Sequence, residues 1–119
     1  MKLLVAVIED TTRIDTILDL FYENGIPGAT VLNSRGMGHV IADHYSIFAR
    51  FSDLTGSSKG SDVHNNTIFT VIKTDETLQL AIELIEEVVG DLNQPDTGLI
   101  FTLPVLDVKG FNTPLTQSQ

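Results

Sequence analysis

The order of the apolar segments constrains the fold more than any other feature of this chain. The run at residues 3–8 predicts a strand buried on both faces. From Thr12, which resembles a helix cap, apolar residues recur at helical spacing as far as Phe21, and Asn24-Gly25 supplies the stop. Residues 29–34 then predict a second strand. The first third of the chain is therefore a strand–helix–strand unit.

The second half of the chain repeats this pattern. Residues 67–73 are rich in β-branched side chains, which favours a third strand. Thr74 is a predicted helix cap, and Gly90 ends the apolar stripe of that helix. Residues 99–108 predict a fourth strand that Pro104 interrupts, because proline cannot donate a hydrogen bond to a sheet.

Two such units in one short chain predict an α+β, ferredoxin-like (βαβ-βαβ) sandwich with a long insert between strands 2 and 3. We expect a single domain over residues 1–119, with a polar tail at 112–119. Both helices would cover one face of a four-stranded antiparallel sheet. The other face, including Phe69 and Phe101, would stay apolar and bare, so we expect a second copy of the chain to cover it.

Composition excludes several classes of function. The 16 acidic residues outnumber the 7 basic ones, giving a net charge of -9, and this argues against nucleic-acid binding. The absence of cysteine excludes disulfides and thiolate chemistry. The apolar N-terminal run is too short to span a bilayer, and no small-residue cleavage site follows it. We therefore expect a cytoplasmic protein without membrane insertion.

The insert, residues 37–66, is too long to be a simple connection, and long loops in compact domains are usually functional or disordered. It contains all three histidines of the chain. His39, Asp43 and His44 are candidate metal ligands, although their spacing matches no known signature and solvated histidines are the simpler interpretation. No Ser-His-Asp constellation can be assigned, so we do not expect an enzyme.

Two segments carry a family resemblance: GATVLNSRGMG at 28–38 and GLIFTLPVLDV at 98–108. Together with KLLVAVI at the start, they resemble the PII family of signal-transduction proteins, in which a strand opens into a long loop at a Gly-Phe-Gly sequence. The resemblance implies a homotrimer whose clefts between subunits bind adenine nucleotides. It also implies that the 37–66 loop binds a target protein.

The resemblance and the glycines indicate a ligand site between subunits. Glycines at the end of a strand let backbone N–H groups approach a ligand closely, although a plain exit turn would also explain them. The predicted ligand-binding residues are Gly36, Met37, Gly38, His39, Thr97 and Gly98. For the last two, an ordinary turn before the final strand is the alternative.

The sequence departs from the family where the nucleotide would bind. Val40 replaces a glutamine, and His39 replaces the basic residue before it. Leu99 replaces a phosphate-binding lysine, and Gly110 and Asn112 stand where the family has two arginines. The cofactor is therefore unknown: an adenine nucleotide fits the resemblance, but the usual basic residues are absent.

Three hypotheses follow. The first is a PII-like regulator that senses a small ligand and binds a protein partner. The second is a metal-binding trimer that resembles the divalent-cation tolerance proteins and uses His39, Asp43 and His44. The third is a scaffolding domain without a small ligand. The sequence names neither the ligand nor the pathway, and a role in nitrogen control does not follow from its residues.

Overall fold

The sheet of the computed structural model has four antiparallel strands in the order β2-β3-β1-β4. The structure describes residues 1–38, 40–41 and 64–111. The strands are β1 (Lys2–Ile8), β2 (Thr30–Ser34), β3 (Asn65–Ile72) and β4 (Gly98–Pro104). This strand order is that of the ferredoxin-like plan, so the predicted fold class is confirmed.

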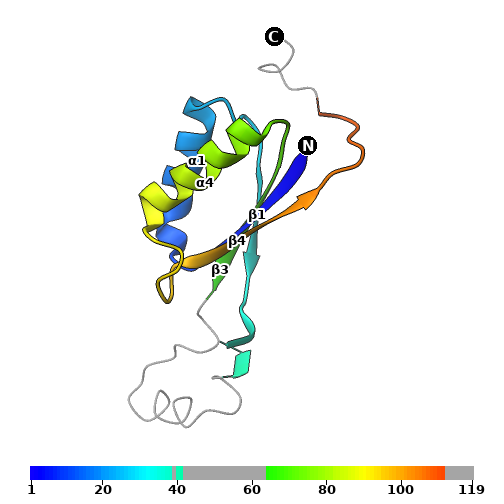
Figure 1. Ribbon diagram of the computed structural model, residues 1–119. Coiled ribbons are helices and arrows are strands. Elements are labelled where there is room, and N and C mark those ends of the chain that lie inside the picture. The colour runs from blue at the N-terminus through cyan, green and yellow to red at the C-terminus, as the bar shows by residue number, and fades with distance from the viewer. Residues whose placement is uncertain (39, 42–63, 112–119) are drawn as a thin grey trace, which may run out of the picture.

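The helices α1 (Ile14–Glu23) and α4 (Asp75–Val89) lie side by side on one face of the sheet (Figure 1). Each helix buries one apolar stripe, as its periodicity predicts. The core lies between these stripes and the sheet residues that point toward them. Its fully buried large side chains are Leu4, Ile8, Ile17, Phe21, Ile68 and Ile85.

The start of the first helix differs from the prediction. Asp10, not Thr12, is the capping residue: it caps a short 3-10 helix, η1 (Thr11–Arg13), and α1 follows from Ile14, where its own N-cap residue Arg13 makes no side-chain capping bond. The Asp10 carboxylate accepts hydrogen bonds from the Thr12 hydroxyl and the Thr12 backbone N–H. These bonds favour the ionised form and lower the pKa of Asp10 below its ordinary value, with Arg13 contributing less.

The second helix begins and ends as predicted. The Thr74 hydroxyl accepts a hydrogen bond from the Thr77 backbone N–H at 3.2 Å, so Thr74 is the N-cap of α4. Gly90 is the C-cap, with a φ of 91°. Thr74 and Gly90 therefore stand at the two ends of α4, as the sequence predicted.

Two strand boundaries differ from the prediction by more than one residue. β3 begins at Asn65, two residues earlier than expected, so Asn65 and Asn66 belong to the sheet rather than to the insert. Both are buried, and Asn66 donates a hydrogen bond to the Asn33 side chain at 2.8 Å. β4 ends at Pro104 instead of continuing to Val108, because Pro104 already lies opposite Lys2, and after the bond from Val105 N–H to the Met1 backbone oxygen, at 3.1 Å, β1 offers no further partner.

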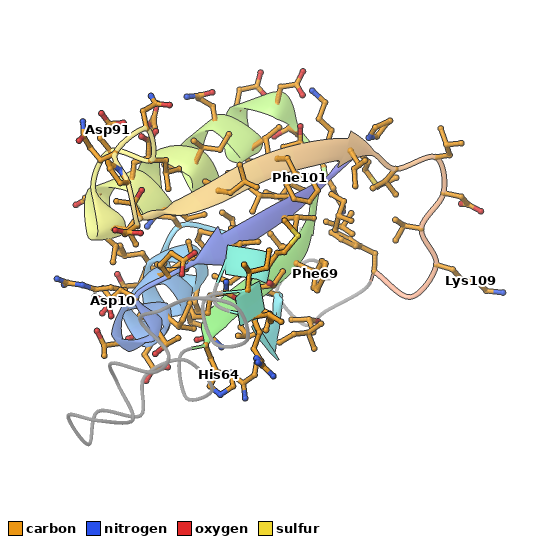
Figure 2. The ribbon with its side chains drawn as sticks, turned by 90° about the horizontal axis from the view of Figure 1, so that it is seen from below. Asp10, His64, Phe69, Asp91, Phe101 and Lys109 are labelled. Carbon is orange, nitrogen blue, oxygen red and sulfur yellow. The ribbon has the colours of Figure 1, made fainter. Side chains whose placement is uncertain are left out.

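The sheet face away from the helices is open, as predicted. Val5 of β1 pairs with Phe69 of β3 on one side and with Phe101 of β4 on the other, so the three side chains share this face. Figure 2 shows Phe69 and Phe101 on the sheet. The exposed fractions are 58% for Leu99, 44% for Phe101 and 46% for Leu103. We call this surface the open face; its apolar members are Leu3, Val5, Val7, Leu32, Phe69, Val71, Leu99, Phe101 and Leu103.

Candidate functional site

The predicted ligand-binding residues lie at one end of the sheet, which we call the loop end. Gly36, Met37 and Gly38 follow β2, while Thr97 and Gly98 stand at the start of β4. Ser34 pairs with Asn65, and Ile8 pairs with both Asn66 and Gly98, which places all of these segments at the same end. His39 and the candidate metal ligands Asp43 and His44 lie outside the described residues.

Within one chain, the loop end does not bring these two segments together. β2 and β4 are the two edge strands, with β3 and β1 between them. At the usual strand spacing, the edges lie about 14 Å apart. A small ligand could contact Gly36 and Gly98 together only where the β2 edge of one chain meets the β4 edge of another.

Gly98 has a structural reason to be glycine. Its φ is 150°, and a Cβ atom at this position would lie 2.4 Å from the backbone oxygen of Val7. Close packing of β4 against β1 therefore requires glycine here, whether or not a ligand binds. Glu9 N–H also donates to the Thr97 backbone oxygen at 3.3 Å, which extends this pairing by one bond.

The segment after β2 is ordered as far as the structure describes it. Residues 37–38 and 40–41 are helical, and Val40 N–H donates to the Gly36 backbone oxygen at 3.2 Å. Met37 is 77% exposed. The glycines thus lead into a helical turn, so the Val40 N–H is already engaged and is not free for a ligand.

A cluster of polar side chains lies beside this segment on the open face. The Ser34 hydroxyl donates to the Asn65 side-chain oxygen and lies 2.8 Å from the Thr67 hydroxyl. Asn65 is only 3% exposed. The pattern of strand residues in the sequence gave no sign of this cluster, because each member looks like an ordinary polar residue near a loop. It makes the loop end of the open face polar while the rest of that face is apolar.

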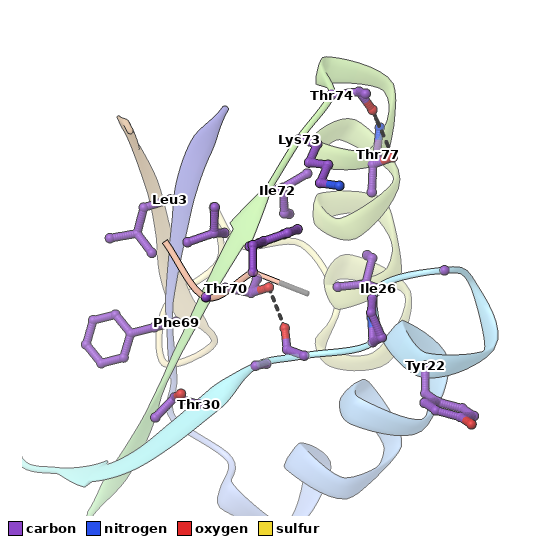
Figure 3. Close-up of a pocket in the computed structure, with 17 residues that line it drawn as sticks. Leu3, Tyr22, Ile26, Thr30, Phe69, Thr70, Ile72, Lys73, Thr74 and Thr77 are labelled. Carbon is purple, nitrogen blue, oxygen red and sulfur yellow. Dashed lines mark hydrogen bonds between the residues drawn. The ribbon is translucent and has the colours of Figure 1, made fainter. Parts of the chain in front are cut away.

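A large cavity lies at the other end of the sheet, and sequence reasoning missed it. It is a half-open groove of about 790 Å³, which we call the upper groove. β2 begins pairing only at Thr30, opposite Phe69, so no strand of the described residues lies beside the edge of β3 beyond Phe69. The chain at residues 25–29 bends around this edge. The Thr70 hydroxyl holds the bend by donating to the Gly28 backbone oxygen at 2.7 Å (Figure 3).

The walls of the upper groove are mostly apolar. Ile26 and Pro27 line it from the bend, Phe69 and Val71 line it from β3, and Phe111 lines it from the C-terminal segment. Lys73 lies at the end of β3 with its Nζ 5.0 Å from the centroid of the Phe111 ring. A volume of this size, with apolar walls and a few polar groups, is typical of a small-molecule site.

The family of the chain follows from a comparison with known protein families. The family model of nitrogen regulatory protein P-II matches residues 1–113, which span both strand–helix–strand units and the segment between them. The chain belongs to the P-II family. This confirms the resemblance found in segments 28–38 and 98–108, and the strand order above is that of the family fold. No curated protein matches the chain.

Family membership makes this chain a PII-like regulatory protein. Proteins of the P-II family are signal transducers rather than enzymes, and they are typically trimers. The helices of the described part are too short or too polar to span a bilayer. Within the described ranges, no three His, Asp or Glu side chains gather into a group that could hold a metal ion.

Proposed function

We propose that this chain is the subunit of a cytoplasmic homotrimer that binds a small effector between subunits and a protein partner through the 37–66 segment. The observation that carries the proposal is the open face. It is a continuous apolar surface over three strands, while monomeric soluble proteins rarely expose contiguous apolar patches of more than a few hundred Å². Sister copies that cover it would resolve this conflict.

The arrangement of the loop end supports an effector site between subunits. Gly36 to Gly38 and Thr97 to Gly98 lie on opposite edges of the sheet, so a site that uses both needs two chains. The upper groove offers a further cavity that one chain forms by itself. An effector bound at either place could change the population of conformations of the segment that leaves β2 at Gly36, because a ligand shifts any equilibrium between states that it binds unequally.

The test combines the molecular mass in solution with a ligand screen. Light scattering of the full chain should give a trimer at micromolar concentration. Thermal denaturation should be screened against nucleotides and common metabolites, since a ligand at about 100 times its dissociation constant stabilises a protein by about 2.7 kcal/mol. A variant in which residues 42–63 are replaced by a short Gly-Ser linker should remain trimeric, keep any thermal shift and lose the partner.

A scaffolding role is the second candidate, and the missing basic residues favour it. Leu99 and Gly110 carry no charge at the positions where the family binds phosphate. A trimer that shows no thermal shift with any compound of the screen would support scaffolding over sensing. A monomer would contradict both proposals.

A further inference from the structure

The charge of the upper groove is positive, opposite in sign to the net charge of the chain. The chain carries 16 acidic and 7 basic residues. Among the described residues that line the groove, however, there is no Asp or Glu, and Lys73 is the one charged side chain. The groove is thus an apolar cavity with a single positive charge in a strongly acidic protein, a composition that favours an anionic guest over a neutral or cationic one.

Lys73 is available to a ligand. Lys2, the other lysine near the N-terminus of α4, forms an ion pair with Asp75 at 3.2 Å. Lys73, by contrast, forms no ion pair within the described residues, and its contact there is with the face of the Phe111 ring. A hydrogen bond between an ammonium and a carboxylate is stronger than an exposed cation–π contact. An anionic ligand could therefore replace the Phe111 ring as the partner of the Lys73 ammonium.

The other polar groups of the groove are largely occupied. The Thr70 hydroxyl donates to Gly28, and the Thr74 hydroxyl donates to the Thr77 hydroxyl while it accepts the Thr77 N–H. Figure 3 shows Lys73, Thr74 and Thr77 together at one end of the groove, with Ile26 and Phe69 along its walls. The Lys73 ammonium beside apolar walls suits a ligand that carries one negative charge on an apolar body. A triphosphate would need several cations.

From these contacts we propose that the upper groove binds a small organic monoanion, a carboxylate on an apolar body, and that Lys73 is the residue that recognises its charge. The proposal rests on the effector-binding function above and names the chemical class of the effector. Binding of the carboxylate draws Lys73 away from Phe111 and so loosens the C-terminal segment that Phe111 holds beside β3.

The experiment uses a matched pair of probes, phenylacetate and its neutral analogue phenylacetamide. Each is titrated to millimolar concentration into the full-length, 15N-labelled chain, and the backbone amide resonances are followed by NMR. We expect phenylacetate to shift the resonances of residues 26–30, 70–73 and 110–111. Phenylacetamide should bind about tenfold more weakly or worse, because a charge-assisted hydrogen bond is lost.

Two variants assign the effect to Lys73. Lys73→Gln removes the charge at an exposed position, so the fold should be kept, which the unperturbed remainder of the amide spectrum will show. It should weaken phenylacetate binding about tenfold and leave phenylacetamide binding unchanged. Lys109→Gln removes an equally exposed lysine that does not line the groove, and it should bind both probes as the wild type does.

Three results would overturn the inference. The first is equal binding of the two probes by the wild-type chain, and the second is binding that Lys73→Gln leaves unchanged. The third is the absence of any shift in the groove with phenylacetate, butyrate or 4-phenylbutyrate. If the shifts instead appear at Gly36, Gly38, Thr97 and Gly98, the effector-binding function survives and the assignment to the upper groove fails. A monomeric chain without any ligand response would remove the proposed function itself.

Discussion

At the scale of single residues, the structure separates glycines that the backbone requires from glycines that it merely tolerates. Gly98 has a positive φ and lies against the Val7 backbone oxygen, so it is fixed by strand pairing. Gly28 has no atom within 4 Å of the position where a Cβ would stand. The two residues lie in the two segments that carry the family resemblance, yet only Gly98 has a steric reason to be glycine.

We predict that Gly98→Ala destabilises the protein by about 1–3 kcal/mol or more, because alanine disfavours this φ and its Cβ collides with Val7. Gly28→Ala is the matched control and should change the free energy of unfolding by less than about 0.5 kcal/mol. Urea denaturation followed by circular dichroism measures both. Equal effects of the two substitutions would show that β4 can shift to accept a side chain.

At the scale of secondary-structure elements, α4 is the element in which the sequence pattern and the structure agree best. Its cap, its apolar stripe and its C-terminal glycine all agree with the sequence pattern. Leu84 is buried in the core together with Ala81 and Ile85, so these side chains contribute to packing within the chain.

We predict that Thr74→Ala lowers the free energy of unfolding by about 1 kcal/mol, because the Thr77 N–H loses its side-chain acceptor. Thr74→Ser keeps a hydroxyl in the same place and should remain within about 0.5 kcal/mol of the wild type. Thermal or urea unfolding of the three proteins makes the comparison. Should serine and alanine prove equally harmful, the lost methyl contact rather than the cap would be responsible.

At the scale of the whole molecule, the two faces of the sheet differ in what covers them. One face is covered by α1 and α4 from the same chain (Figure 1). The open face has nothing over its strands among the described residues, although Leu99, Phe101 and Leu103 stand there in a row. A packed core would need this second face to be covered as well, and the chain has no further described element to cover it.

We predict that Phe101→Asp converts the proposed trimer into monomers at micromolar concentration. The substitution removes a large apolar side chain worth about 1.5–3 kcal/mol on burial, and it places a charge on the open face of every subunit. Tyr22→Asp is the control, because Tyr22 is an aromatic residue that is 63% exposed on α1, on the helical side of the sheet. Sedimentation equilibrium should find this control still trimeric; a trimeric Phe101→Asp variant would locate the interface elsewhere.

The sequence by itself determined the elements and their order. Apolar spacing located α1 and α4, β-branched runs located β3, and the repeated strand–helix–strand unit indicated the sheet that the structure contains. These features depend on residues close together along the chain, and local periodicity and capping record such contacts directly. The same reasoning placed the helix cap at Thr12, whereas Asp10 caps η1 and α1 begins only at Ile14; both Asp and Thr are good caps, and only the backbone path decides between them.

Only the tertiary structure decided which predicted site residues can meet. Gly36 and Gly98 looked like parts of one site in the sequence, but they lie on opposite edges of the sheet. The upper groove brings together Ile26, Phe69, Lys73 and Phe111 from three parts of the chain. None of these residues belongs to a motif. A cavity arises where one strand begins later than its neighbour and a distant segment crosses the gap, and the spacing of residues along a sequence does not encode that geometry.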